Sequence, residues 1–219
     1  MRTKHVQRPT NVLAGLLALV AITALSAGDV RAASPAETFV QSSIDQSYAI
    51  LSDGASSAPE KEQRFLTLLQ SVVDVRRVAL FTLGPYVRNA TPADTETFEH
   101  AFAGFLAAVY QRGLDNYASP KVMGSTERTP DDVIVNVTAS SSNGAGPPES
   151  LAFRVRGTSS GGLLVTDIQV DGAWLAILQR SDFTAYLQQH GGNLTALAAE
   201  LDRRTAQVRL ALSRRRRDS

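Results

Sequence analysis

The stretch from Leu163 to Phe183 constrains the fold most, because its hydrophobic pattern changes period halfway. Its first half alternates between two faces, one with Leu164, Thr166, Ile168 and Val170 and the other with Leu163, Val165, Asp167 and Gln169. A period of two predicts a strand with at least one buried face. The Asp171-Gly172 pair then predicts a tight turn, and the apolar run after it predicts a helix that carries the only Trp.

The rest of the second half predicts three more strands. Alternation is weak over 121–129 and clear at Val133, Val135 and Val137, and it returns at Leu151, Phe153 and Val155. The Ser-, Gly- and Pro-rich segment 140–148 and the turn 159–162 separate these strands. Because short connections favour neighbouring strands, we expect a four-stranded antiparallel meander.

The remaining segments show helical spacing of apolar residues and helix start signals. Pro59 suits a first turn, Asp74 suits a cap, and Thr91-Pro92-Ala93-Asp94 predicts the start of a long helix with an apolar stripe rich in Phe. The expected helices cover 36–51, 74–83, 91–117, 173–190 and 193–213, and one more begins at Pro59. About six helices and one sheet predict an α+β fold in which the long helix and its neighbours cover one face of a curved sheet.

The N-terminal segment 1–32 is typical of a secretory signal peptide. Arg2, Lys4 and Arg8 precede an apolar run from Val12 to Ala27, and small residues end the segment. An uncleaved anchor is the alternative, but the run is shorter than the about 20 residues of a membrane span. We therefore expect export to the periplasm, with residues 33–213 as one domain.

The charge distribution argues against nucleic acid as a partner. The net charge of the whole chain is +1 at pH 7. Residues 1–32 carry a net charge of +3, so the remaining residues carry −2. The segment 214–219 contains four consecutive Arg, which leaves the body at −5. A basic nucleic-acid footprint needs Lys and Arg along a face of the domain. We expect the basic tail to be a solvated, disordered end, although contact with anionic lipid or a partner is an alternative.

Motifs of catalysis are scarce. The chain has no Cys, and neither His100 nor His190 has a second His at ligand spacing, so we expect no metal and no cofactor. Gly-x-Ser-x-Gly, P-loop and dinucleotide motifs are missing as well. Asp167 and Asp171 are conceivable as an acid–base pair, but a turn Asp and a rim Asp are the simpler interpretation.

Two groups of residues carry a family resemblance. Asp167, Ile168, Gly172, Leu175, Arg180 and Phe183 resemble the "DV...GxSL...R..F" segment of the MlaC-type, or toluene-tolerance, phospholipid-binding proteins. The segment 73–86, with Leu83-Gly84-Pro85-Tyr86, is similar to that family's "VDxxxxxxxVLGxYW" helix. The similarity covers roughly residues 35–205. Trp174 stands where most members of the family have Ser, and Leu163 stands where many have Trp. The Gly-x-Trp variant is nearer to the hopanoid-associated (HpnM) branch of the family.

The resemblance implies a non-enzymatic periplasmic lipid carrier with an NTF2-like sheet. Its cargo would be a phospholipid or a hopanoid held by its apolar tails. Its partners would be an inner-membrane ABC transporter with an MCE-domain protein and an outer-membrane lipoprotein/porin complex. An exported hydrolase acting on lipid or cell-wall material and an adaptor that binds only protein are the alternatives.

With a lipid as the cargo, an apolar sheet face opposite the Phe-rich helix is the expected cavity. The predicted lipid-binding residues are Leu83, Tyr86, Phe102, Phe105, Val109, Val133, Val135, Val137, Phe153, Val155, Ile168, Val170 and Trp174. Trp174 is expected either to contact the ligand or to fill the space left by Leu163.

Overall fold

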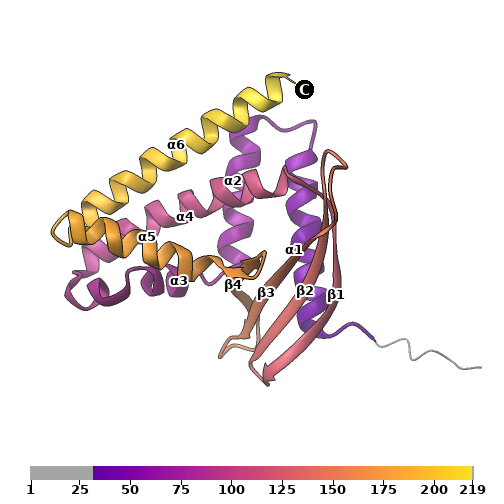
Figure 1. The fold of residues 1–219 in the computed structure, drawn as a ribbon, viewed down its shortest axis with the longest axis horizontal. Helices are drawn as coiled ribbons and strands as arrows, with labels where there is room; N and C mark the ends of the chain where they lie inside the picture. The colour runs from indigo at the N-terminus through magenta and orange to yellow at the C-terminus, as the bar shows by residue number, and fades with distance from the viewer. Residues whose placement is uncertain (1–31, 219) are drawn as a thin grey trace, which may run out of the picture. The chain divides into compact units, whose positions relative to one another are not determined.

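The structure is a computed structural model that describes residues 32–218, so the predicted signal peptide lies almost wholly outside the described residues. Its helices are α1 (Pro35–Ser52), α2 (Ala58–Val72), α3 (Val75–Thr82), the 3₁₀ helix η1 (Gly84–Asn89), α4 (Pro92–Leu114), α5 (Leu175–Gln189) and α6 (Leu194–Asp218). Its strands are β1 (Tyr117–Thr129), β2 (Asp132–Ser141), β3 (Glu149–Gly157), β4 (Leu163–Val170) and β5 (Ala173–Trp174). The prediction of an α+β fold is confirmed (Figure 1).

Local caps explain where several helices begin. Ser34 accepts a hydrogen bond from the N–H of Glu37, whose carboxylate accepts from the N–H of Ser34, and this capping box starts α1. Asp74 accepts from the N–H of Arg77 at the start of α3, and Thr91 accepts from the N–H of Asp94 at the start of α4. The predicted start signals at Asp74 and Thr91 are therefore confirmed.

The sheet is an antiparallel meander with strand order β1-β2-β3-β4-β5, so the predicted four strands are one too few. Asp171 and Gly172 have φ of 49° and 80°, which gives a two-residue hairpin turn that leads into β5 rather than directly into α5. Val73 adds an isolated parallel bridge to Val165. The first strand is also longer than expected, because the long helix ends at Leu114 and β1 begins at Tyr117.

A bulge at Thr166 reverses the predicted faces of the first part of β4, before Asp167. Arg154 pairs with Asp167 but Val155 pairs with Val165, which leaves Thr166 as an extra residue in the ladder. As a result, Val165 lies on the same face as Ile168 and Val170, although strict alternation assigned it to the other face. The inner face of β4 is therefore continuous with that of β3 despite the change in register.

Helix α1, rather than the long helix, covers β1 and β2, whereas α2, α3 and α5 contact β4. Helix α1 packs against β1 and β2 and forms a core with Val135, Val137 and Val155 (Figure 1). Helix α4 packs mainly against α6, and its Phe98 and Phe102 rings meet Phe183 of α5 edge to face at 6.1 and 6.2 Å between ring centroids. The described part of the chain thus has two hydrophobic cores, one under α1 and one among the helices.

The C-terminal segment is helical rather than disordered. Helix α6 continues to Asp218, so the backbone of Arg214 to Arg217 forms its last turns, and the predicted helix end near Ser213 is wrong. Arg215 also bonds the side chain of Asn116, with 3.0 Å between Nη1 and Oδ1. The basic residues therefore belong to the same helix that packs on α4.

Candidate functional site

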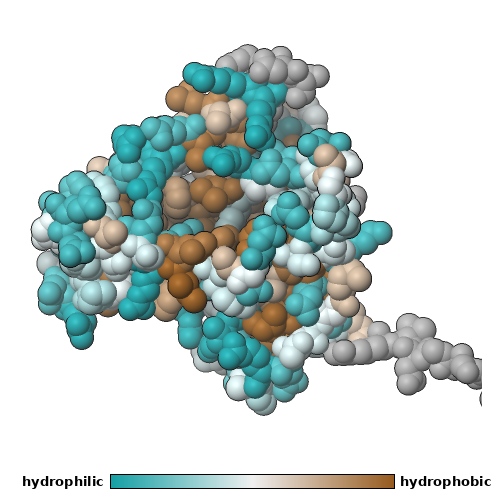
Figure 2. Space-filling view, in the orientation of Figure 1, coloured by the Kyte–Doolittle hydropathy of each residue, from teal (hydrophilic) through white to brown (hydrophobic). Residues whose placement is uncertain are grey.

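A cavity of about 660 Å³ lies between the sheet and the helices. Figure 2 shows a recess with hydrophobic residues around it below α6. The walls come from α1, α2, the second half of α4, strands β3 and β4, the first residue of α5, and α6. The volume lies in the range of about 300–1,000 Å³ that is typical of small-molecule sites.

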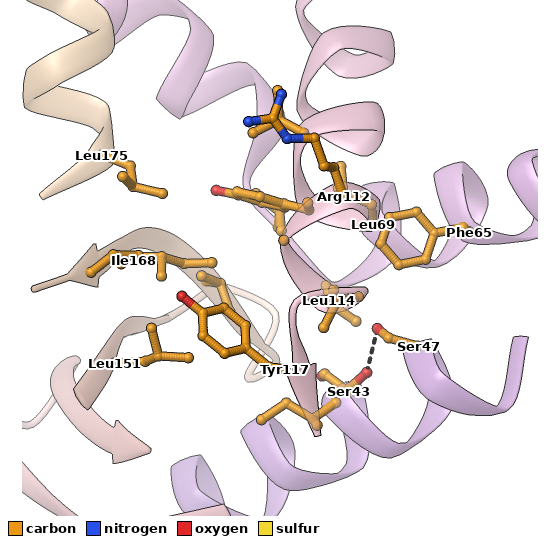
Figure 3. A pocket seen from close by; sticks show the side chains of 18 of the residues that line it. Ser43, Ser47, Phe65, Leu69, Arg112, Leu114, Tyr117, Leu151, Ile168 and Leu175 are labelled. Carbon is orange, nitrogen blue, oxygen red and sulfur yellow. Dashed lines mark hydrogen bonds between the residues drawn. The ribbon is translucent and has the colours of Figure 1, made fainter. Parts of the chain in front are cut away.

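The cavity lining is predominantly aliphatic and aromatic. The apolar lining residues are Val40, Ile44, Phe65, Leu68, Leu69, Val72, Val73, Phe105, Val109, Leu114, Leu151, Phe153, Val165, Ile168, Val170, Leu175 and Val208. The polar ones, apart from Gly113, are Ser43, Ser47, Tyr110, Arg112, Asn116, Tyr117, Arg204 and Gln207 (Figure 3). Among the described residues that line it there is no Asp, Glu, His or Cys.

Five of the predicted lipid-binding residues line this cavity. They are Phe105, Val109, Phe153, Ile168 and Val170. Phe153, Ile168 and Val170 share the inner face of β3 and β4, where Phe153 pairs with Ile168. Phe105 and Val109 lie four residues apart on one side of α4, which places them one turn apart.

The other valines predicted for the cavity lie in the core instead. Val135, Val137 and Val155 are at most 2 % exposed and pack under α1, and Val133 packs against the same core. The prediction placed α4 over this part of the sheet, but α1 packs there instead. Phe102 and Leu83 are fully buried among the helices and also lie outside the lining.

Tyr86 and Trp174 lie away from the cavity as well. Tyr86 borders a separate hollow of about 300 Å³, where its ring lies beside Gly192. Trp174 is half-buried in β5, opposite Gln169, and only its neighbour Leu175 reaches the lining. These positions overturn the predicted placement of both residues in the cavity.

Comparison with known proteins identifies the family. The model of the MlaC family ("MlaC protein") matches residues 41–203. The chain belongs to the MlaC family. This match confirms the resemblance that the motifs around Asp167 and Leu83 indicated.

A solved structure has the same fold. The phospholipid-binding protein from Ralstonia solanacearum, in complex with a phospholipid, is 25 % identical, with a TM-score of 0.63. The match covers 80 % of this chain and 99 % of that protein. No curated protein sequence matches the chain.

Most polar groups around this MlaC-family cavity have partners within the protein. The Tyr48 hydroxyl donates to the carbonyls of Leu114 and Tyr117 at 3.2 and 2.8 Å and so ties α1 to the end of α4. The Tyr117 hydroxyl donates to Glu149, and burial raises the pKa of Tyr117 to about 12. The hydroxyls of Ser43 and Ser47 donate to helix carbonyls one turn before them. These residues line or support the cavity with their polar atoms already satisfied.

Several lining residues were not predicted from the sequence. The end of α2 carries an unusually wide apolar face, formed by Leu68, Leu69, Val72 and Val73. The width of this face is the sequence feature that could have indicated that these residues line a cavity. Tyr110 belongs to the apolar stripe of the long helix but was not selected. Arg112 and Arg204 carried no sequence signal, because an Arg on a helix surface is common.

The described residues contain neither a metal-binding cluster nor a helix that could span a membrane. Within 32–218, no group of three or more His, Asp and Glu side chains is arranged to hold a metal ion. His190 stacks on Tyr186 with 3.9 Å between ring centroids, and its Nδ1 lies 2.8 Å from the Tyr186 carbonyl oxygen. No helix in this part of the chain has the length and hydrophobicity to cross a membrane.

Proposed function

We propose that this protein is a periplasmic lipid carrier that holds a phospholipid by its acyl chains in the cavity under α6. The observation that carries the proposal is the apolar cavity of about 660 Å³ on a fold whose Ralstonia relative was solved with a phospholipid. The lining of aliphatic and aromatic side chains matches acyl chains, and membership of the MlaC family supports lipid transport.

The energetics explain why such a carrier needs partners. Two acyl chains with about thirty CH₂ groups cost about 24 kcal/mol to expose to water, at about 0.8 kcal/mol each. A carrier does not need a net affinity of this size, because the lipid comes from a bilayer that is equally apolar. The direction of transfer must therefore come from other proteins. We propose an inner-membrane ABC transporter with an MCE-domain protein as one partner and an outer-membrane lipoprotein/porin complex as the other.

The cavity lining favours a carrier over a hydrolase. Hydrolysis of an ester or glycosidic bond needs a general acid or base close to the substrate. The described lining residues include serines and tyrosines but no His, Asp or Glu, and the two serine hydroxyls already donate to backbone carbonyls. A bound lipid would therefore meet no residue pair that is suited to cleave it.

Mass spectrometry of co-purified lipid tests the proposal. The full chain is expressed with export in a Gram-negative bacterium, purified without detergent and extracted with organic solvent. We expect phospholipid in clear excess over an unrelated exported protein. A yield no greater than that of the unrelated protein would overturn the proposal.

Three substitutions to Asp locate the bound lipid. Val170→Asp places a carboxylate in the cavity and should abolish lipid retention with the circular dichroism unchanged. Val135→Asp, in the core under α1, should instead unfold the protein. Ile177→Asp lies on the exposed face of α5, with Ile177 55 % exposed, and should change neither property. Lipid retention by folded Val170→Asp would contradict the assignment of the cavity.

A further inference from the structure

The charges in the cavity lining are all of one sign. Arg112 of α4 and Arg204 of α6 both line the cavity, and none of the described lining residues is acidic. Since the described lining is otherwise neutral, these two guanidinium groups are its candidates for binding an anionic part of a ligand.

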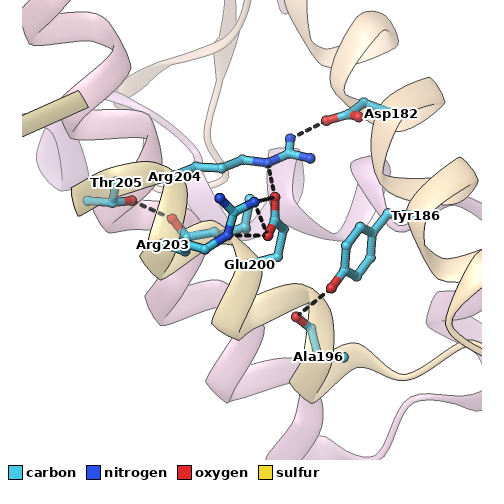
Figure 4. Close-up of polar contacts among 8 residues, drawn as sticks. Asp182, Tyr186, Ala196, Glu200, Arg203, Arg204 and Thr205 are labelled. Carbon is cyan, nitrogen blue, oxygen red and sulfur yellow. Dashed lines mark hydrogen bonds and ion pairs between the residues drawn. The ribbon is translucent and has the colours of Figure 1, made fainter. Parts of the chain in front are cut away.

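Arg204 is already held by carboxylates outside the lining. Its Nε lies 2.7 Å from Oε1 of Glu200, and its Nη1 pairs with Asp182 of α5 (Figure 4). Glu200 also binds Arg203, and this cluster fixes α6 to α5. The charge of Arg204 is thus compensated within the protein, and its role is structural.

Arg112 has no such compensation. Its side chain is exposed, and in the described part of the chain it forms no ion pair or hydrogen bond. Figure 3 shows it at one end of the cavity, opposite the end where Ser43 and Tyr117 lie. The guanidinium is therefore free to bind an anionic ligand whose apolar part fills the cavity.

Tyr110 is a second lining residue of α4 that carries a hydrogen-bond donor. Tyr110 lines the cavity two residues earlier in α4, and its hydroxyl forms no hydrogen bond with the residues of 32–218. Burial raises the pKa of Tyr110, so the hydroxyl keeps its proton near neutral pH. By contrast, the Tyr117 hydroxyl is occupied by Glu149. The Tyr110 hydroxyl is therefore available as a donor to an acceptor oxygen of a ligand in the cavity.

We propose that Arg112 binds the phosphate of the lipid carried in the cavity and so selects phospholipids over neutral lipids. The guanidinium group offers two parallel N–H donors that match two phosphate oxygens. A neutral polycyclic lipid such as a hopanoid offers no anion to this residue. The inference rests on the proposed function, because it assumes that a lipid occupies the cavity.

A structural role at the helix end is the alternative. Arg112 lies in the last turn of α4, where a cation stabilises the helix dipole. That role predicts a small loss of stability for Arg112→Gln and no change in lipid selection. Measuring both properties on the same variants separates the two roles.

A competition between two lipids tests the proposal. The purified full chain is incubated with detergent micelles that hold equal amounts of phosphatidylglycerol and a diacylglycerol with identical acyl chains. The detergent is then removed, and the lipid bound to the protein is quantified by mass spectrometry. The wild type should prefer phosphatidylglycerol, and Arg112→Gln should lower that preference about tenfold, which is the effect of losing one charge-assisted contact of about 1.4 kcal/mol.

Two control variants keep the test specific. Arg112→Lys keeps the charge but not the fork, so its preference should fall between those of the wild type and Arg112→Gln. Arg88→Gln removes an exposed arginine from the last turn of η1, away from the cavity, and should leave the preference unchanged. Inorganic phosphate at the same concentration should not displace the lipid, because it has no acyl chains; displacement would mean that the site binds free phosphate.

The outcomes distinguish the two proposals. An unchanged preference in folded Arg112→Gln, with lipid still bound, would overturn the role of Arg112 and leave the carrier function intact. If the wild type binds neither lipid above the level of an unrelated protein, the carrier function itself fails.

Discussion

The Oδ1 atom of Asp167 accepts a hydrogen bond from the backbone N–H of Ala176 at 3.0 Å and ties strand β4 to the first turn of α5. Helix α5 has no local cap, because its N-cap residue is Trp174, whose side chain makes no capping bond. A helix start leaves several N–H groups without partners, and Asp167 satisfies one of them from the neighbouring strand. The same oxygen accepts from the N–H of Ile168. This arrangement explains the Asp of the family motif without a catalytic role.

We predict that Asp167→Ala lowers the free energy of unfolding by about 1–2 kcal/mol, the usual cost of losing a helix cap. Asp167→Asn keeps an acceptor oxygen at the same place and should lose less. Urea unfolding of the three proteins, followed by circular dichroism, measures the difference. Equal stability of the Ala and Asn variants would show that the hydrogen bond to Ala176 contributes nothing.

An ion pair on the outer face of the sheet should make the folded protein less stable in acid. Asp132 is 7 % exposed at its side chain and binds Arg154 through Oδ1 at 2.9 Å and Oδ2 at 2.6 Å. The hydrogen bonds from Arg154 hold the pKa of Asp132 below its usual value. Because the folded state releases this proton at lower pH than the unfolded chain, the pair contributes stability above the unfolded pKa of about 3.9, and that stability is lost as the pH falls through the folded pKa.

Asp132→Asn should therefore cost about 2 kcal/mol at pH 7 and progressively less in acid. Urea unfolding at a series of pH values from neutral to acid measures this. Asp131→Asn changes the exposed neighbour, which lies in the turn before β2, and serves as the control. A loss of stability in Asp132→Asn that stays the same at every pH would contradict the charge-based explanation.

The sequence predicted those parts of the fold that depend on neighbouring residues. The helix caps at Asp74 and Thr91 depend on residues only a few positions away, and so does the alternation of apolar residues in β2 and β3. Such local features can be recognised directly in the sequence. The bulge at Thr166 has no such signal, because any residue can occupy the extra position. One inserted residue was sufficient to move Val165 to the opposite face.

The candidate site was only partly predictable for a related reason. Val135 and Val170 have the same side chain and the same strand pattern, yet one is core and the other lines the cavity. The difference comes from α1, which covers β1 and β2 and leaves the start of β3 and the end of β4 open to the cavity. Which helix covers which strand is set by contacts far apart in sequence, and periodicity does not record them.

Trp174 is the only tryptophan of the chain. It pairs with Gln169 near the end of β4, whereas Leu163 pairs with Gly157 at the start of that strand. Six residues of strand separate the two positions by about 20 Å, so Trp174 does not fill the space beside Leu163. Because Trp174 also lies outside the cavity lining, we expect its emission maximum to be the same in lipid-loaded and lipid-stripped protein.

A double variant shows that the measurement would detect contact with lipid. Trp174→Phe with Leu175→Trp moves the only indole by one residue, to a position that lines the cavity. Its emission should shift to shorter wavelength on loading, because acyl chains replace water around the ring. A shift of the same size in the wild type would place Trp174 in contact with the ligand. A silent wild type beside a responsive double variant would assign Trp174 to the junction of β5 and α5, where it helps to hold Leu175 against the cavity.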